Sequence, residues 1–165
     1  MIWEINRMSE GPADDAKSID ASGFEALERA TGLSGFKLDD ESRHRIEWAL
    51  FWARTSQAKK AQVDIANLIV ELAVQYSHAA QKSVLAKAGE AGRSAGKAKG
   101  EAPTPSFFAF VRKAVEFVPE AGALSDAELD QHMRKALSAA KRQKDDPKSK
   151  MPPERREELH LALAK

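Results

Sequence analysis

The sequence predicts an all-α protein, a compact irregular bundle of about five or six helices with a flexible Gly/Ala/Lys linker. Three observations support this fold class. Residues 36–88 contain neither glycine nor proline and are rich in strong helix formers. Four of the nine glycines lie between Gly89 and Gly100. Apolar residues repeat with helical spacing on both sides of that glycine-rich stretch.

Composition excludes several classes of protein. Apolar residues make up 42% of the chain, charged residues make up 31%, and the net charge is +1, which is typical of a globular domain rather than a disordered or membrane protein. Cysteine is absent, so the sequence excludes disulfides, thiolate metal sites and a cysteine nucleophile. Residues 1–5 lack the pattern of a signal peptide, and no 18 apolar residues run together. We therefore expect a cytoplasmic protein without membrane contact.

The domain organisation expected from these patterns is a single domain in three parts. Residues 1–88 form an N-terminal arm and the main helical core, and residues 89–103 form a flexible basic linker. Residues 104–165 form a helical hairpin and a short terminal helix that pack on the same core. The helical pair 104–144 has only about 40 residues, near the size below which a domain rarely folds alone without disulfides or metal, so it must share the core of the first part.

The first helix is expected to begin at Ser22, because Ser22 and Glu25 have the spacing of a capping box. Gly32 is expected to end it. Before this helix, a cluster of apolar residues, Ile2, Trp3 and Ile5, is expected to pack as an arm.

The glycine-free region predicts two helices, about 42–56 and 60–87. Their apolar stripes, one around Ile46 and one around Ile65, would lie about 90° apart on a continuous helix, which favours a joint. A single helix over the whole region remains the alternative, because no breaker separates the two. The expected polar face of the second helix includes Glu71, Gln75 and His78.

The C-terminal part predicts three boundaries. Thr104 is expected to cap a helix that Pro119 terminates, and Ser125 and Glu128 form a second capping box. A last short helix over residues 153–164 is expected to dock loosely.

The candidate binding residues are Trp48, Phe51 and Trp52. They project roughly opposite or oblique to the Ile46 stripe, so the helix has apolar residues on more than one side. Either neighbouring helices surround this helix, or another chain covers its second side.

Catalytic and metal-binding patterns are weak. The four histidines are scattered, and Glu157 with His160 gives only one Glu-x-x-His spacing near the end of the chain. We therefore expect no cofactor, no metal and no enzymatic activity. The leading hypothesis is a helical protein that acts through protein–protein interaction, including self-association.

The alternative hypothesis is an accessory nucleic-acid-binding protein. Its candidate residues are Arg93, Lys97 and Lys99 in the linker, together with the basic stretch 141–156, which could neutralise phosphates. Aromatic residues do not interleave with these cations, which weakens this hypothesis relative to the first.

Overall fold

The structure is a computed structural model, and it describes residues 19–55, 61–85 and 103–164. Within these residues the protein is all-α, as predicted. Six helices of ten residues or more are present, with one additional single turn. The helices are α2 (Ala21–Ala30), α3 (Asp40–Thr55), α4 (Ala61–Ala80), α5 (Pro105–Val115), α6 (Pro119–Gly122), α7 (Asp126–Asp145) and α8 (Pro153–Ala162).

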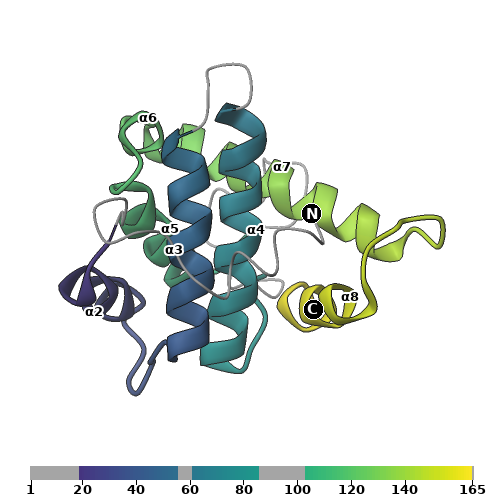
Figure 1. Ribbon diagram of the computed structural model, residues 1–165, viewed down its shortest axis with the longest axis horizontal. Coiled ribbons are helices and arrows are strands. Elements are labelled where there is room, and N and C mark those ends of the chain that lie inside the picture. The colour runs from purple at the N-terminus through teal and green to yellow at the C-terminus, as the bar shows by residue number, and fades with distance from the viewer. Residues whose placement is uncertain (1–18, 56–60, 86–102, 165) are drawn as a thin grey trace.

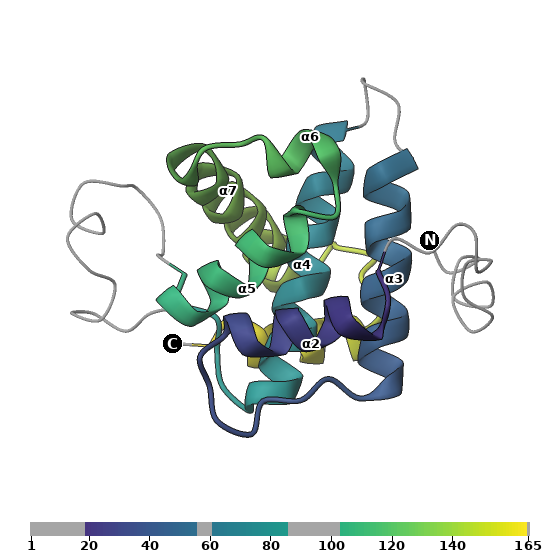
Figure 2. The ribbon, with the colours of Figure 1, turned by 90° about the vertical axis from the view of Figure 1, so that its left-hand side faces the viewer.

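Two of these helices, α3 and α4, form an antiparallel hairpin at the centre of the bundle (Figure 1). The structure thus decides between the two alternatives for the glycine-free region in favour of two helices. Helices α7 and α8 pack against α4, while α2 packs against α5 (Figure 2). Because α4 also contacts α5, it is the helix around which the C-terminal part assembles.

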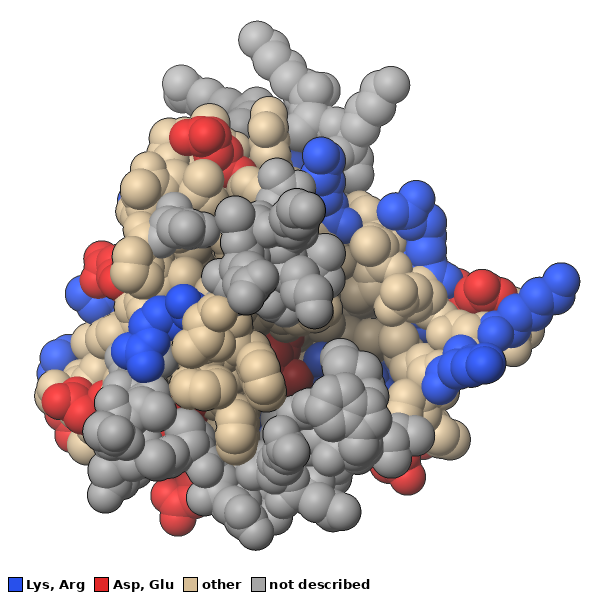
Figure 3. Space-filling view, turned by 45° about the horizontal axis from the view of Figure 1, so that its top comes forward, with Lys and Arg blue, Asp and Glu red and all other residues tan. Residues whose placement is uncertain are grey.

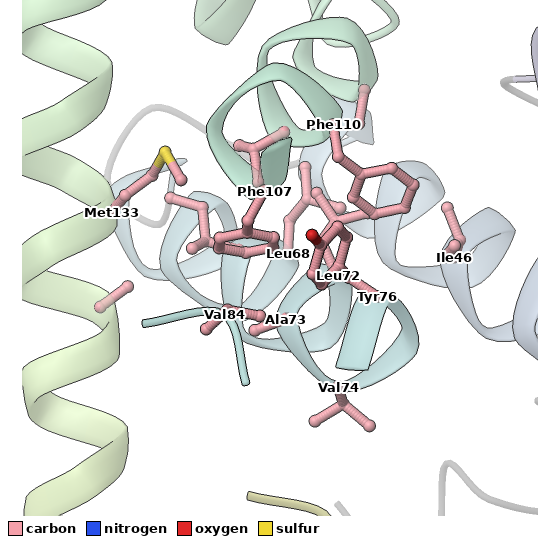
Figure 4. Close-up of a cluster of buried hydrophobic side chains, with 14 of the residues drawn as sticks. Ile46, Leu68, Leu72, Ala73, Val74, Tyr76, Val84, Phe107, Phe110 and Met133 are labelled. Atoms are coloured by element: carbon pink, nitrogen blue, oxygen red, sulfur yellow. The ribbon is translucent and has the colours of Figure 1, made fainter. Parts of the chain in front are cut away.

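The core lies between α4 and its neighbours and is rich in aromatic residues. The ring of Tyr76 on α4 lies 5.3 Å from that of Phe107 and 5.7 Å from that of Phe110, both on α5 (Figure 4). The ring of Phe36, from the segment between α2 and α3, lies 5.5 Å from Tyr76. The C-terminal part therefore shares one continuous core with the region before residue 86.

Two predicted caps are confirmed. The side chain of Thr104 accepts a hydrogen bond from the backbone N–H of Phe107, and Pro105 occupies the first turn of α5. Ser125 and Glu128 form the predicted capping box at the start of α7, with reciprocal bonds of 3.2 Å and 3.1 Å. Both signals are local in sequence, so neither depends on the rest of the fold.

The predicted cap of the first helix is wrong. Asp20 caps α2 by accepting a hydrogen bond from the N–H of Gly23, and Ser22 donates its hydroxyl to Asp20. The carboxylate two residues earlier competes successfully, because an Asp side chain is at least as good a cap as Ser. The main bond, from Gly23, lowers the pKa of Asp20 below its usual value.

The ends of two helices also differ from the expectation. Helix α4 ends at Ala80 rather than near residue 87, because Gln81 adopts a positive φ of 55° and Val84 and Leu85 leave the helix to enter the core. Helix α5 ends at Val115, and Pro119 begins α6 instead of ending α5. Proline suits a first helical turn, where its missing N–H has no intrahelical partner to lose.

The terminal helix, α8, docks firmly, contrary to the expectation. It buries Leu159, Ala162 and Leu163. The backbone N–H of Val84 donates to the carbonyl of Ala162 at 2.9 Å, which ties the chain end to the segment after α4. Of the described residues, none belongs to a helix long and apolar enough to cross a membrane.

Candidate protein-binding face

Helix α3 has two opposite apolar sides. Ile46, Leu50 and Ala53 are buried in the core and face α4. Trp48, Phe51 and Trp52 are centred about 170° around the helix from that stripe at 100° per residue. We call the side of α3 that carries these three aromatic residues the outer face.

The three aromatic side chains of the outer face pack on one another. The rings of Trp48 and Trp52 stack with centroids 6.1 Å apart and an interplanar angle of 19°. Phe51 meets both edge-on, at 5.5 Å from Trp48 and 5.4 Å from Trp52. Mutual contacts of this kind hold large side chains in fixed orientations, which lowers the entropy cost of binding through them.

Burial within this aromatic cluster is uneven. Trp52 is 42% exposed, one of two exposed large apolar residues among those described, the other being Leu161. Trp48 is only 9% exposed, yet it does not belong to the core cluster that joins the other buried apolar residues of the described chain. Of the two sequence-based alternatives for α3, a helix wholly surrounded by its neighbours does not describe the exposed Trp52.

Two polar atoms of the outer face are buried and unpaired. The indole Nε1 of Trp48 has no hydrogen-bond partner, and neither does Nε2 of His44, one turn before it on the same face. Buried donors of this kind are nearly always bonded in proteins, because leaving one unpaired costs about 1–3 kcal/mol. Both atoms are enclosed by the fold, so each lowers its stability and neither is accessible to an incoming group.

A network of charged side chains joins α3 to α4 and α8. Nε of Arg45 on α3 lies 2.8 Å from Oε1 of Glu71 on α4, and Nη2 of Arg155 on α8 lies 2.9 Å from Oε2 of the same carboxylate. Arg45 also donates to Glu158 of α8 at 2.7 Å. Nε2 of Gln75 donates to Oε1 of Glu71 at 2.9 Å.

This network holds a permanent positive charge on α3. Burial acts to lower the pKa of Arg45, but Glu71 and Glu158 outweigh it and the pKa is raised above its usual value. Three helices therefore meet at one carboxylate, and one of them, α8, is distant in sequence from the other two. The network keeps α3 in one orientation, with its aromatic side turned away from α4.

The sequence did not predict this network. Glu71 and Gln75 were expected on a polar face of α4, but both are buried. Their spacing of four residues places them on one side of the helix, and this is the one local signal for the pair. Nothing local indicates that Arg155 lies opposite, because the contact requires α8 to dock.

The other candidate residues are only partly described. Arg93, Lys97 and Lys99 lie outside the described residues. In the basic stretch 141–156, Arg155 is engaged with Glu71, and Arg156 donates to the backbone carbonyl of Lys144. The fold therefore uses two of the cations that the alternative hypothesis assigned to nucleic acid.

Three side chains of α4 that could take part in acid–base chemistry, those of Glu71, Tyr76 and His78, have separate surroundings. Tyr76 is buried in the core, His78 is exposed and lies 3.4 Å from Asp39, and Glu71 belongs to the charged network. Among the described residues, no three His, Cys, Asp or Glu side chains are grouped so that they could hold a metal ion.

No protein-family model matches the chain, and comparison with curated proteins and with solved structures finds no significant similarity.

Proposed function

We propose that this protein acts without catalysis, by binding protein through the outer face of α3, and that a second copy of the chain is one such partner. The observation that carries the proposal is the exposed Trp52, stacked on Trp48 and supported by Phe51. Tryptophan is the residue type most enriched among interface residues that dominate binding energy.

The geometry of the face suits self-association. In a twofold dimer the same patch meets itself, so one protruding aromatic side chain can pack against its own copy. The charged network supports α3, because Arg45 would lose its ion pairs with Glu71 and Glu158 if it rotated away from them. A rigid aromatic anchor binds at lower entropy cost than a mobile one.

Sedimentation velocity over a range of concentrations tests the proposal. We expect the wild-type chain to show a monomer–dimer equilibrium and Trp52→Glu to weaken the dimer at least tenfold, because a buried carboxylate in the contact has no partner. Leu161→Glu is the matched control, since Leu161 is the other large apolar residue exposed in the described part of the chain and lies on α8. A wild-type monomer at all concentrations, or equal effects of the two variants, contradicts self-association through α3.

A second candidate function is nucleic-acid binding, which one observation favours. Basic side chains gather over the far end of α7 and the loop after it (Figure 3). Three of them, Arg142, Lys148 and Lys150, are exposed. Exposed cations that are not committed to a core contact can neutralise phosphates and release counterions.

Retention of the protein on DNA or RNA at increasing salt tests this second candidate. If it is correct, retention falls steeply with salt and is lost when Arg142, Lys148 and Lys150 become Ala. Replacing Arg93, Lys97 and Lys99 by Ala measures separately how much the linker contributes to retention on nucleic acid. Retention that does not change with salt excludes the candidate.

A further inference from the structure

The loop between α7 and α8, which projects from one side of the bundle (Figure 1), contains an ordered turn. In residues 146–149 the N–H of Ser149 donates to the carbonyl of Asp146 at 3.1 Å. The carboxylate of Asp146 also accepts a bond of 2.9 Å from the N–H of Lys148. Aspartate at the first position of a β-turn and proline at the second, here Pro147, are both favoured. The local sequence therefore specifies the turn.

A side chain of α8 holds this turn against the end of α7. The guanidinium of Arg156 donates to the backbone carbonyl of Lys144 in the last turn of α7. It also lies 3.4 Å from the carbonyl oxygens of Asp146 and Ser149, to which it donates as well. Arginine suits this role, because its planar fork carries five donors in a fixed arrangement. One guanidinium thus joins α7, the turn and α8.

Three cations extend from this support without an anionic partner. Lys148 lies in the turn, Lys150 follows it, and Arg142 lies in the last turn of α7, and all three are exposed. In the described part of the chain no carboxylate pairs with them, and the two nearest acids in sequence, Asp145 and Asp146, are engaged with other groups. The dipole of α7 favours Arg142 at its C-terminal end, but Lys148 and Lys150 lie beyond the helix. The fold therefore presents positive charges that an external anion can neutralise.

The surroundings of these cations favour the phosphates of a double-stranded nucleic acid. Residues 126–156 contain no Phe, Trp or Tyr, whereas proteins that bind single strands stack the bases on aromatic side chains. The first turn of α7 carries two exposed acids, Asp126 and Glu128, which would repel phosphates if the helix lay along a groove. Contact is thus confined to the backbone at one end of α7, and backbone contacts carry no direct sequence information.

A membrane surface fits this end of the molecule less well. Basic segments that bind anionic lipids contain about 4–8 cations, and amphipathic membrane anchors add large apolar side chains. Among the described residues, the exposed large apolar side chains are Trp52 on α3 and Leu161 near the opposite end of α8. The turn therefore has no apolar anchor beside it in the described chain.

We propose that residues 142–150 form a preformed contact for the phosphate backbone of a nucleic-acid duplex. Arg142, Lys148 and Lys150 touch phosphates, and Asp146 and Arg156 are positioning residues that fix the turn. This inference rests on the second candidate function, nucleic-acid binding, and adds the form of the nucleic acid and the origin of the geometry. Cations that are fixed before binding lose less conformational entropy when they meet the phosphates.

The salt dependence of binding to a short fluorescent DNA duplex measures the phosphate contacts. Three contacts give a slope of about −2.7 for log K against log salt, and each of Arg142→Ala, Lys148→Ala and Lys150→Ala should reduce its magnitude by about 1. The matched control is Lys37→Ala, which removes an exposed lysine between α2 and α3 and should leave the slope unchanged. Slopes that none of the three variants changes, or that the control changes equally, overturn the contact.

The form of the nucleic acid is tested with the same measurement on other probes. Duplexes of two unrelated sequences should bind equally, and either single strand should bind about tenfold more weakly or less, because there is no aromatic surface for its bases. Equal or tighter binding of the single strands overturns the preference for a duplex. Tighter binding of vesicles that contain anionic phospholipid than of the duplex overturns the choice of nucleic acid over membrane.

Two substitutions of Asp146 separate the position of the cations from their charge. Asp146→Asn keeps a side-chain acceptor for the N–H of Lys148, whereas Asp146→Ala does not, and both variants remove the same negative charge. If charge alone governs binding, the two variants bind the duplex equally, and more tightly than wild type. If the turn positions the cations, Asp146→Ala should bind about threefold or more weakly than Asp146→Asn. Equal binding of the two variants overturns the positioning role of Asp146.

Arg156→Lys tests the second positioning residue, because it keeps the positive charge and loses the planar fork. We expect the affinity for the duplex to fall about threefold or more, while the salt slope stays within about 0.5 of the wild-type value. Wild-type affinity in Arg156→Lys, together with a slope reduced by about 1 in Arg156→Ala, would show that Arg156 itself touches a phosphate. Urea denaturation of each variant shows whether it is folded, and the Asp146 pair decides the matter if Arg156→Lys is not.

These results also separate the inference from the function on which it rests. Absence of salt-dependent binding of the wild-type chain to DNA and RNA removes nucleic-acid binding and this inference together. Binding that depends on Lys148 and Lys150, but not on the choice of residue at positions 146 and 156, keeps the function and removes only the preformed turn.

Discussion

Arg155 near the start of α8 binds the carboxylate of Glu71 in the middle of α4 at 2.9 Å, on the oxygen opposite the one that Arg45 of α3 contacts. One carboxylate is therefore the shared counterion of two guanidinium groups from helices that are far apart in sequence, and Glu158 supplies a second negative charge beside Arg45. The side chain of Glu71 is 10% exposed. The ion pairs are thus shielded from water much more than the surface pairs of this protein, such as Lys113 with Glu116.

Glu71→Gln should destabilise the fold, because the neutral amide leaves Arg45 and Arg155 without their shared counterion. Breaking a buried ion pair costs about 3–5 kcal/mol, and the partial exposure of both arginines reduces this to about 2–4 kcal/mol. Urea denaturation measures the change. Glu116→Gln is the control, for which we expect about 1 kcal/mol or less. Equal losses in the two variants would show that the network contributes no more than a surface pair.

The local signals in the sequence predicted the helices well. Ser125 with Glu128 and Thr104 with Pro105 each specify a helix start within four residues, and the structure has both. The choice between Asp20 and Ser22 was missed, because both side chains can cap a helix and two residues separate them. Which one succeeds depends on the register in which α2 packs.

Contacts between helices were beyond what the sequence alone could predict. Glu71 and Gln75 look like solvent-facing residues until α8 brings Arg155 against them, and a polar residue on one helix does not indicate its partner on another. The spacing of Trp48, Phe51 and Trp52 predicted a second apolar side on α3. It did not predict that these residues are buried to different extents, because burial depends on what covers each residue in the folded chain.

Stability should depend on pH through Asp39, which caps α3. A hydrogen bond from the backbone N–H of Ser42, the largest cause, lowers the pKa of Asp39 below its usual 3.8, and the Ser42 hydroxyl and His78 add to this effect. The folded state thus favours the charged carboxylate. Its contribution is fully present well above pH 3.8 and is lost as the pH falls through the lower pKa of the folded state.

Asp39→Asn removes this titration and tests the direction of the shift. The urea concentration at the midpoint of unfolding is measured for wild type and variant between about pH 2 and pH 6. The two midpoints should differ near about pH 6, where the carboxylate of Asp39 is charged. The difference should shrink as the pH falls below 3.8. A difference that stays constant over this range would mean that the carboxyl of Asp39 has the same pKa in the folded and unfolded states.

Tyr76→Phe should stabilise the protein. The Tyr76 side chain is fully buried among Phe36, Phe107 and Phe110, and its hydroxyl has no hydrogen-bond partner. Phenylalanine keeps the ring contacts and removes a buried unpaired group, which should raise the free energy of unfolding by about 1 kcal/mol. Phe107→Ala, in the same cluster, should lower it by about 3–5 kcal/mol. A loss of stability in Tyr76→Phe would show that the hydroxyl is satisfied in solution.

The two sides of α3 should respond differently to truncation. Ile46→Ala removes a fully buried side chain from the core and should cost about 2–5 kcal/mol. Trp52→Ala removes a larger side chain, but that side chain is 42% exposed and stacks on Trp48, so the expected loss is about 1 kcal/mol. Thermal or urea unfolding of both variants measures the contrast. A tryptophan that the fold hardly needs is available for binding, whereas a loss of stability for Trp52→Ala equal to that for Ile46→Ala would assign this side chain to the core.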